Sequence, residues 1–247
     1  MSTYSKYLVC IPTYNEALNI AEVVERTLAL NIEGLQILVV DDNSPDGTQE
    51  IVEQIIKKDA SKKQPRVHLL ARSKKEGLGP AYLAAFKWGL ERGYAFIVEM
   101  DADGSHQPEE LPRLITAASS ADLVLGTRWI PGGRVINWPI HRKAISRLGT
   151  WYAEIALRLP YKDLTGGFRL YNCGVLKKID LRSIKTRGYG FQIEMALRAV
   201  EVGAKVAEVP ITFIERTQGR SKMSRAIVVE ALVHTTKLGI TRYMKRR

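Results

Sequence analysis

Asp101 and Asp103 stand two residues apart, directly after an apolar run, in an arrangement that suits metal chemistry. The run, residues 97–100, predicts a buried strand, and a spacing of two points both carboxylates to the same side. Their oxygens suit Mg²⁺ or Mn²⁺, which bind through one or two carboxylates, several waters and substrate phosphates. The pair therefore indicates a metal site for a nucleotide diphosphate. The alternative at this point is a plain turn, because Asp and the following Gly104 also favour turns.

The first half of the chain must position this pair, and it alternates between strand and helix patterns. We predict strands at residues 7–11, 35–40, 67–70, 95–100 and 123–126, with helices at 17–30, 48–58, 80–92 and from 108 onward. Repeated strand–helix–strand units predict an α/β fold with a mainly parallel central sheet and helices on both faces. Ligands bind such sheets beyond the carboxyl ends of the strands, where polar residues gather in this chain. That clustering favours a ligand site over a plain turn.

The second half follows a less regular pattern. In order, we expect a loop at 131–139, a helix at 141–159, a strand-like piece at 163–171, a helix at 190–202, a strand at 204–214, a polar loop at 216–222 and a final amphipathic helix at 226–243. Pro210 places the strand that contains it on a sheet edge. We expect one catalytic domain over residues 1–224, followed by a C-terminal amphipathic helix and basic tail over residues 225–247.

The chain of 247 residues has a formal charge of +11, and most of the excess lies from Arg128 onward. Such a charge attracts phosphate, whether in nucleic acid, anionic lipid or a phosphorylated substrate. No run of about 18 apolar residues and no signal-peptide pattern is visible, so we expect a soluble, cytosolic protein. Cys10 and Cys173 lack metal-ligand spacing and imply no disulfide framework. Gly77 and Gly79 lack the third glycine of a dinucleotide fingerprint, which argues against a nicotinamide cofactor.

Six motifs occur in order along nearly the whole chain. They are Pro12-Thr13-Tyr14-Asn15-Glu16, residues 39–48 (VVDDNSPDGT), Glu99-Met100-Asp101-Ala102-Asp103, Gly126-Thr127-Arg128 with Gly132-Gly133, residues 163–169 (DLTGGFR) and residues 190–194 (GFQIE). Together they resemble the inverting, metal-dependent glycosyltransferases of family 2, which have the GT-A fold. Within that family the sequence is similar to the polyprenol (dolichol) phosphate mannosyltransferases. The resemblance implies transfer of mannose from GDP-mannose to a polyprenyl monophosphate at the cytoplasmic face of a membrane.

The resemblance also implies roles for individual residues. Those expected to bind the nucleotide sugar are Pro12, Tyr14, Glu16, Asp42, Asp101, Ala102 and Asp103, to which we add Lys75 at the end of the third predicted strand. Asp101 and Asp103 would hold the metal, with Ser105 as a third ligand where some relatives have Gln. Those expected around the donor and acceptor phosphates are Arg128, Asp163, Arg169, Gln192 and Glu194.

The implied acceptor determines what the side chains must do. A phosphate monoester has a second pKa of about 6 and is mostly ionised at neutral pH, so we expect no catalytic base and a structural role for His106. The difficulty is to bring two anions together at close range. The basic residues expected to surround the acceptor are Arg128, Arg142, Arg169, Arg216 and Lys222. The alternative for Arg142 and Arg216 is a solvated surface charge or an ion pair.

A lipid acceptor requires contact with a membrane surface. The final helix can present an apolar side beside basic residues, and the alternative is that this side packs on the sheet domain. A second apolar surface is expected from Trp138, Ile140, Ile145, Leu148, Trp151 and Tyr152. A membrane-protein partner that anchors the enzyme is left open by the sequence.

Two alternative functions remain at this point. A nucleic-acid-binding protein would explain the basic charge, but it leaves Asp101 and Asp103 without a role. No nucleic-acid-binding motif is visible, so we expect no nucleic-acid partner. A family 2 glycosyltransferase that uses UDP-glucose or another nucleotide sugar would keep the same fold and site, because donor specificity depends on a few hydrogen bonds.

Overall fold

The computed structural model describes residues 6–61, 64–186, 188, 190–216 and 225–245. In this part of the chain, seven strands form a main sheet in the order β3-β2-β1-β4-β7-β5-β8. The strands are β1 (Tyr7–Thr13), β2 (Leu35–Asp41), β3 (Val67–Ala71), β4 (Phe96–Glu99), β5 (Leu123–Thr127), β7 (Arg169–Asn172) and β8 (Val206–Pro210). Within this sheet β7 runs antiparallel to both of its neighbours, β4 and β5, and the other pairs are parallel. The predicted mainly parallel sheet is confirmed.

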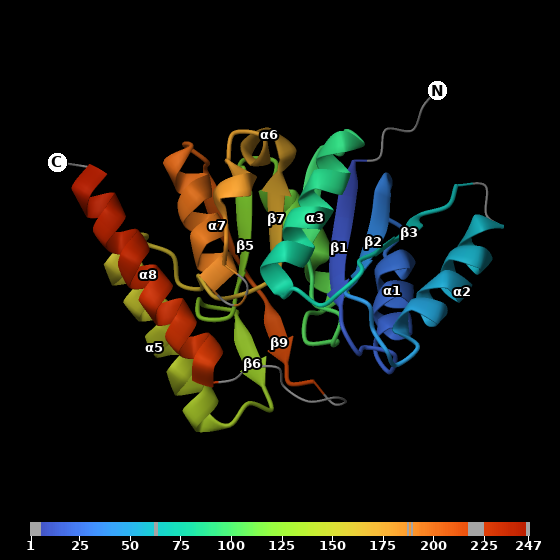
Figure 1. Ribbon diagram of the computed structural model, residues 1–247, viewed down its shortest axis with the longest axis horizontal. Helices are drawn as coiled ribbons and strands as arrows, with labels where there is room; N and C mark the ends of the chain where they lie inside the picture. Colours follow the sequence, from blue (N-terminus) through green and yellow to red (C-terminus); the bar gives the residue numbers. More distant parts are fainter. Residues whose placement is uncertain (1–5, 62–63, 187, 189, 217–224, 246–247) are drawn as a thin grey trace.

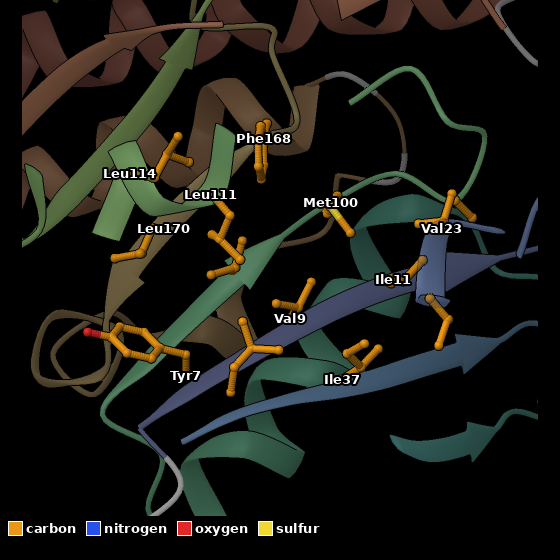
Figure 2. Close-up of a cluster of buried hydrophobic side chains, with 14 of the residues drawn as sticks. Tyr7, Val9, Ile11, Val23, Ile37, Met100, Leu111, Leu114, Phe168 and Leu170 are labelled. Atoms are coloured by element: carbon orange, nitrogen blue, oxygen red, sulfur yellow. The ribbon is translucent and has the colours of Figure 1, made fainter. Parts of the chain in front are cut away.

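Apolar side chains on both faces of the strands explain why helices cover both sides of the sheet. Successive strand residues point to opposite faces, so Val9 and Ile11 enter one buried cluster while Leu8 and Cys10 enter the other. The first cluster, part of which Figure 2 shows, packs against α1, α2 and α4, and the second against α3, α6 and α7. These helices are α1 (Ile20–Ala29), α2 (Thr48–Ala60), α3 (Leu78–Glu91), α4 (Leu111–Ala117), α6 (Cys173–Leu176) and α7 (Gly190–Glu201). The predicted coverage of both faces is confirmed.

Two further helices, α5 (Ile140–Leu157) and α8 (Arg225–Lys245), lie beside each other at one end of the molecule (Figure 1). A Cβ atom on Gly239 of α8 would lie 2.6 Å from the carbonyl oxygen of Ala156 in α5, so the missing side chain permits this close approach. Helix α8 also contacts α7. The predicted final helix is confirmed, and the domain boundary before residue 225 stays a prediction.

Helix α8 is less clearly divided into an apolar and a polar side than the sequence predicted. Its side toward α5 and α7 includes the buried Thr235, whereas its exposed residues include Val229, Val233 and Ile240. Apolar residues thus occur on the outer side as well. Within the described part of the chain, none of the helices has the length and apolar character that crossing a membrane requires.

Two predicted elements of the second half differ from the structure. Residues 131–139, predicted as a loop, include strand β6 (Arg134–Ile136), which pairs with β9 (Thr212–Ile214) in a separate two-stranded sheet. The predicted strand at 204–214 is therefore two strands, with β8 on the edge of the main sheet and β9 outside it. Pro210 has no N–H to continue a ladder, and β8 ends there. The strand-like piece at 163–171 forms a strand only from Arg169 onward. Short 3₁₀ helices, η1 (Pro108–Glu110) and η2 (Leu181–Ser183), complete the described elements.

Candidate active site

Side chains at the ends of β1 and β2 fasten two loops to each other. The Thr13 hydroxyl donates to Asp41 Oδ1 at 2.8 Å, and Asp41 Oδ2 accepts from the Ser44 backbone N–H at 2.9 Å. The Asn15 backbone N–H donates to Ser44 Oγ at 3.0 Å. Asn15 and Asn43 have φ angles of 57° and 58°, a left-handed conformation that Asn adopts more readily than most residues. The polar residues at the ends of β1 and β2 therefore hold the two loops against each other.

The end of β3 joins this group through Arg72 and Lys75. Arg72 Nη1 lies 2.5 Å from Asp42 Oδ1, and the Glu76 backbone N–H donates to Asp42 Oδ2 at 3.1 Å. Lys75 Nζ lies 3.9 Å from the centre of the Tyr14 ring, within cation–π range. Arg72 was not predicted as a site residue. Its position in the sequence could have identified it, because it directly follows β3 just as Asp42 directly follows β2.

The loop after β4 holds Asp101 and Asp103 through local contacts. Asp103 Oδ1 accepts from the Ser105 backbone N–H at 3.0 Å, and the Asp101 backbone N–H donates to His106 Nδ1 at 3.1 Å. His106 is 1% exposed and stacks on the Phe168 ring, with the ring centres 5.2 Å apart. The structure thus places His106 as a buried support of the loop. Ser105 contributes a backbone N–H here, and its role as a metal ligand stays a prediction.

Carboxyl groups at the end of β4 have raised pKa values. Burial raises the pKa of Asp101, and the charge of Asp103 adds to this effect, while Arg216 opposes it. Burial also raises the pKa of Glu99 to about 8, with the Arg169 charge acting in the opposite direction. Such shifts mean that additional positive charge beside the carboxyl groups is favourable.

Two arginines from different elements meet carboxylates in this region. Arg216, shortly after β9, has its Nη2 atom 2.7 Å from Asp103 Oδ2. Arg142, on α5, pairs through Nη1 with Glu215, and its guanidinium lies 4.2 Å from the centre of a Trp138 ring. The side chains of Arg216 and Arg142 are 17% and 16% exposed. Both side chains therefore form ion pairs, which the alternative had included, and neither is a solvated surface charge.

Arg128, which directly follows β5, is held in place by Asp163. Its Nε and Nη2 atoms lie 2.6 and 2.7 Å from the two Asp163 oxygens, which makes a bidentate pair. Burial alone would raise the pKa of Asp163, but the Arg128 charge and its hydrogen bonds outweigh burial and hold that pKa below its usual value. The guanidinium also lies 5.4 Å and 5.3 Å from the ring centres of Trp138 and Phe213. Arg128 thus has a fixed orientation, and Asp163 compensates much of its charge.

Arg169 does not have the position that its motif suggested. It is 1% exposed and donates to the backbone carbonyls of Leu164 and Gly166, each at 2.8 Å, and to that of Gln192. Strand β7 pairs with β4 so that Arg169 stands opposite Glu99, and the backbone carbonyls that accept from its guanidinium offset the cost of burying it. The predicted phosphate contact is therefore corrected: Arg169 ties the loop before β7 to the start of α7.

A pocket joins the charged groups to the two outer helices. Its polar lining includes Asp101, Asp103, Arg128, Arg142, Gln192 and Arg216. Its apolar lining includes Trp138, Ile145, Tyr152, Ile193, Phe213 and Leu232. The lining positions of α5 recur every three or four residues from 142 to 152, so one face of this helix forms a wall. Positive charge, carboxylates and apolar surface therefore meet in one space.

Comparison with known proteins identifies the family of this chain. Residues 8–180, which are more than half of the chain, match the family Glycosyl transferase family 2. The chain belongs to glycosyltransferase family 2. It is 49% identical over 235 residues to an undecaprenyl-phosphate mannosyltransferase from Micrococcus luteus, covering 95% of this chain and 94% of that protein. It is 47% identical over 234 residues to a polyprenol monophosphomannose synthase from Mycolicibacterium smegmatis, covering 94% and 86%.

Solved structures show the fold of this family 2 glycosyltransferase. Glucosyl-3-phosphoglycerate synthase from Mycobacterium tuberculosis, solved with Mn²⁺, UDP and glucosyl-3-phosphoglycerate, matches with a TM-score of 0.67 and 15% identity, covering 98% of this chain and 79% of that chain. A structure of the same enzyme with Mn²⁺, UDP and phosphoglyceric acid has a TM-score of 0.70 and 16% identity, covering 95% and 78%. The predicted GT-A fold is thus confirmed. Family membership also selects an enzyme over the alternative of a nucleic-acid-binding protein.

The residues predicted for this glycosyltransferase fall into separate groups. Those that line the pocket are Asp101, Asp103, Arg128, Arg142, Gln192 and Arg216. Those within or after β1, β2 and β3 are Pro12, Tyr14, Glu16, Asp42 and Lys75, and Ala102 is buried between the two aspartates. Lys222 lies outside the described residues. The structure thus gives each described residue a position, and its individual role stays a prediction.

Proposed function

We propose that this glycosyltransferase transfers mannose from GDP-mannose to a polyprenyl monophosphate, with inversion at the anomeric carbon and with a divalent cation. The observation that carries the proposal is the pocket, in which two carboxylates and three arginines adjoin apolar faces of α5 and α8. A substrate with a phosphate at one end and a long hydrocarbon chain behind it fits this combination. The names of the relatives at 49% and 47% identity, an undecaprenyl-phosphate mannosyltransferase and a polyprenol monophosphomannose synthase, support the same sugar and acceptor.

Asp101 and Asp103 would hold Mg²⁺ or Mn²⁺. The residues fit such an ion, because both carboxylates line the pocket and Asp103 already lies against the positive charge of Arg216. Two carboxylates suit a cation that takes its other ligands from water and substrate phosphates. When bound, the ion would offset the charge that develops on the leaving diphosphate. The Mn²⁺ complexes of glucosyl-3-phosphoglycerate synthase support this choice.

The chain's own residues bind and orient the substrates. The acceptor phosphate is mostly ionised at neutral pH and attacks without a proton acceptor, in agreement with the buried position of His106. Attack from the side opposite the diphosphate inverts the anomeric carbon. Arg142 and Arg216 would reduce the repulsion between the acceptor phosphate and the donor diphosphate, which is large at close range. Arg128 and Gln192 line the same pocket and would orient the acceptor.

The donor nucleoside would bind at the ends of β1, β2 and β3. Tyr14 and Lys75 are in contact there, and Asp42 is held by Arg72. The contacts among these side chains fix their orientation before the nucleotide arrives, which reduces the entropy that binding costs. The backbone near Glu16 is fixed as well, since its N–H donates to Thr48 Oγ1 at 3.0 Å.

We further propose that the outer faces of α5 and α8 contact the cytoplasmic surface of a membrane. The exposed apolar side chains of these faces include Ile140, Leu148, Trp151, Ile155, Val233 and Ile240. Arg147 and Lys237 lie among them, and each basic residue near an anionic surface contributes roughly 1 kcal/mol. Since the inner side of α8 meets α5 and α7, this helix combines packing on the protein with an outer surface for lipid.

Transfer of labelled sugar tests the reaction. GDP-mannose and UDP-glucose are each incubated with a polyprenyl monophosphate, with Mg²⁺ or Mn²⁺ and with a chelator. The proposal predicts a labelled lipid from GDP-mannose that the chelator abolishes. UDP-glucose is the second candidate donor, because glucosyl-3-phosphoglycerate synthase has been solved with it, and transfer from UDP-glucose alone would replace the donor in the proposal. No transfer by a folded protein that binds either nucleotide would contradict the proposed acceptor.

Sedimentation with anionic liposomes tests the membrane contact. Trp151→Glu places a charge on the outer face of α5 and should lower the bound fraction. Leu18→Glu is the matched control, because Leu18 is also exposed, at 73%, but lies just before α1. Equal binding by both variants and the unchanged protein would assign the lipid contact to another surface.

A further inference from the structure

The ion pair between Arg216 and Asp103 occupies one of the two carboxylates proposed to hold the divalent cation. Arg216 Nη2 lies 2.7 Å from Asp103 Oδ2. The other oxygen, Asp103 Oδ1, accepts from the Ser105 backbone N–H at 3.0 Å. The Asp103 side chain is 8% exposed, so solvent and salt screen this pair only weakly. Both oxygens of Asp103 are thus engaged by groups of this chain.

A guanidinium and a metal ion are alternative occupants of the same position. Mg²⁺ bonds to carboxylate oxygens at about 2.0–2.1 Å, so an ion bound at Asp103 Oδ2 would lie close to the Arg216 guanidinium that contacts the same oxygen. Two positive groups side by side at one carboxylate also repel each other. Cation binding at Asp103 therefore favours displacement of Arg216 from Oδ2.

We propose that Arg216 is an internal competitor for the cation at Asp103, and that its release couples metal binding to nucleotide binding. This inference rests on the proposed function, which supplies the cation and the diphosphate. The cation displaces the guanidinium from Asp103, and the diphosphate oxygens offer it a new partner of the bidentate kind that Arg prefers. Because both ligands favour the displaced guanidinium, each raises the affinity for the other by the same factor. Arg216 is thus a positioning residue for the cation and, once displaced, a ligand for phosphate.

Arg142 provides a matched comparison within the same pocket. It is as buried as Arg216, at 16% and 17% exposed, but its partner is Glu215 rather than Asp103. Removal of Arg142 takes one positive charge from the pocket and leaves the contacts of Asp103 in place. A general change of the electrostatic field would act in both variants, whereas competition at Asp103 would act only in the Arg216 variant.

Titration of the whole chain with Mn²⁺ in the absence of nucleotide, followed by the paramagnetic resonance signal of free Mn²⁺, tests the competition. Arg216→Gln should bind Mn²⁺ about tenfold more tightly than the unchanged protein, the factor expected when a competitor holds the site about nine-tenths of the time. Arg142→Gln should stay within about twofold of the unchanged protein. Arg216→Met is a second neutral variant of similar length, and circular dichroism confirms that each variant is folded.

Two outcomes would overturn the proposal. One is an unchanged Mn²⁺ affinity in folded Arg216→Gln and Arg216→Met, and the other is equal tightening in Arg142→Gln. Arg216→Lys keeps the positive charge, so tightening as large as in Arg216→Gln would also exclude charge competition. The proposal further requires that GDP raise the Mn²⁺ affinity by a larger factor in the unchanged protein than in Arg216→Gln.

The same titration separates this inference from the proposed function. If the Mn²⁺ differences are found but no mannosyl transfer occurs, the reaction is wrong and the competition stands. If no variant binds Mn²⁺ with or without GDP, both the metal site and the competition are overturned.

Discussion

The proposed donor side and the proposed lipid side of the site are built by different means. At the ends of β1 to β4, directed polar contacts such as those of Asp42 with Arg72 and of Asp103 with Ser105 fix individual atoms. At α5 and α8, the contacts are apolar faces and the close approach of Gly239 to Ala156. Hydrogen bonds depend steeply on geometry, whereas apolar burial scales with area. We therefore expect that the loss of one polar atom on the donor side changes activity strongly. A change of apolar area on the lipid side should alter activity or acceptor binding only by small amounts.

Asp103→Asn is the change with the largest expected effect, because it replaces an ionised oxygen on the donor side. We expect the transfer rate to fall by about 10²–10³-fold, the range for loss of one group that stabilises transition-state charge. Initial rates with labelled GDP-mannose measure the change. The exposed Glu25 of α1 supplies the control, since Glu25→Gln removes a carboxylate far from the pocket lining. A fall of less than about tenfold in Asp103→Asn would mean that this carboxylate is not part of the charge-stabilising site.

Gly239→Val tests the lipid side alone. The added Cβ would meet the Ala156 carbonyl oxygen at 2.6 Å, so α8 must shift away from α5. Overpacking of this kind costs about 1–3 kcal/mol, and we expect a lower midpoint of thermal unfolding together with a higher KM for the lipid acceptor. The KM for GDP-mannose should not change. An equal rise in both KM values would show that the two sides are not independent.

Glu99→Gln tests a titratable carboxyl group that is buried beneath the donor side. Burial raises the pKa of Glu99 to about 8 from an ordinary value of 4.5, so between these values the folded protein keeps a proton that the unfolded chain has lost. Stability should therefore fall as pH rises through this window, by up to about 1.4 kcal/mol per pH unit. Glu99→Gln should remove that slope. Urea unfolding at several pH values measures it, and parallel curves for the variant and the unchanged protein would disprove the buried titration.

Lys75→Met has the smallest expected effect. It removes the ammonium that lies 3.9 Å from the Tyr14 ring centre, a contact of a kind worth about 0.5–1 kcal/mol at exposed sites. We expect the KM for GDP-mannose to rise about two- to fivefold, because 1.4 kcal/mol corresponds to a factor of ten. The acceptor KM should stay the same. A larger change for acceptor than for donor would place Lys75 on the lipid side.

Local sequence patterns predicted the strands and helices of the first half of the fold because each of these elements is marked by its own residues. Strands β1 to β4 are mostly apolar runs with polar residues at or shortly after their ends, and each of these features is visible without a structure. Strand β6 was missed, and β9 was predicted only as the end of a single strand at 204–214, since each has three residues and their pairing joins segments that are far apart in sequence. The strand propensity of a short segment carries no information about which distant segment it pairs with.

The site shows the same division between local and distant information. The spacing of Asp101 and Asp103 indicated their common loop, and their placement in one pocket follows from that spacing. Arg169 was assigned to phosphate because its motif and its charge are visible in sequence, whereas the carbonyls of Leu164 and Gln192 that it binds are not. The partner of Arg216 was equally invisible, because an ion pair between β9 and the loop after β4 depends on the folded arrangement.

The antiparallel direction of β7 makes one part of the lipid side, the segment that contains α5, an insertion between two neighbouring strands of the main sheet. The chain leaves the main sheet after Thr127 of β5 and re-enters at Arg169 of β7, which pairs with Leu125 of β5. Everything between them, including β6 and α5, is an excursion that begins and ends at two neighbouring strands and adds no strand to the main sheet. Changes of length or sequence in this excursion leave the strand order intact. A scaffold of this kind can alter the α5 part of the proposed acceptor surface by changes in one continuous segment, while α8 and the strand ends proposed to bind the donor remain as they are.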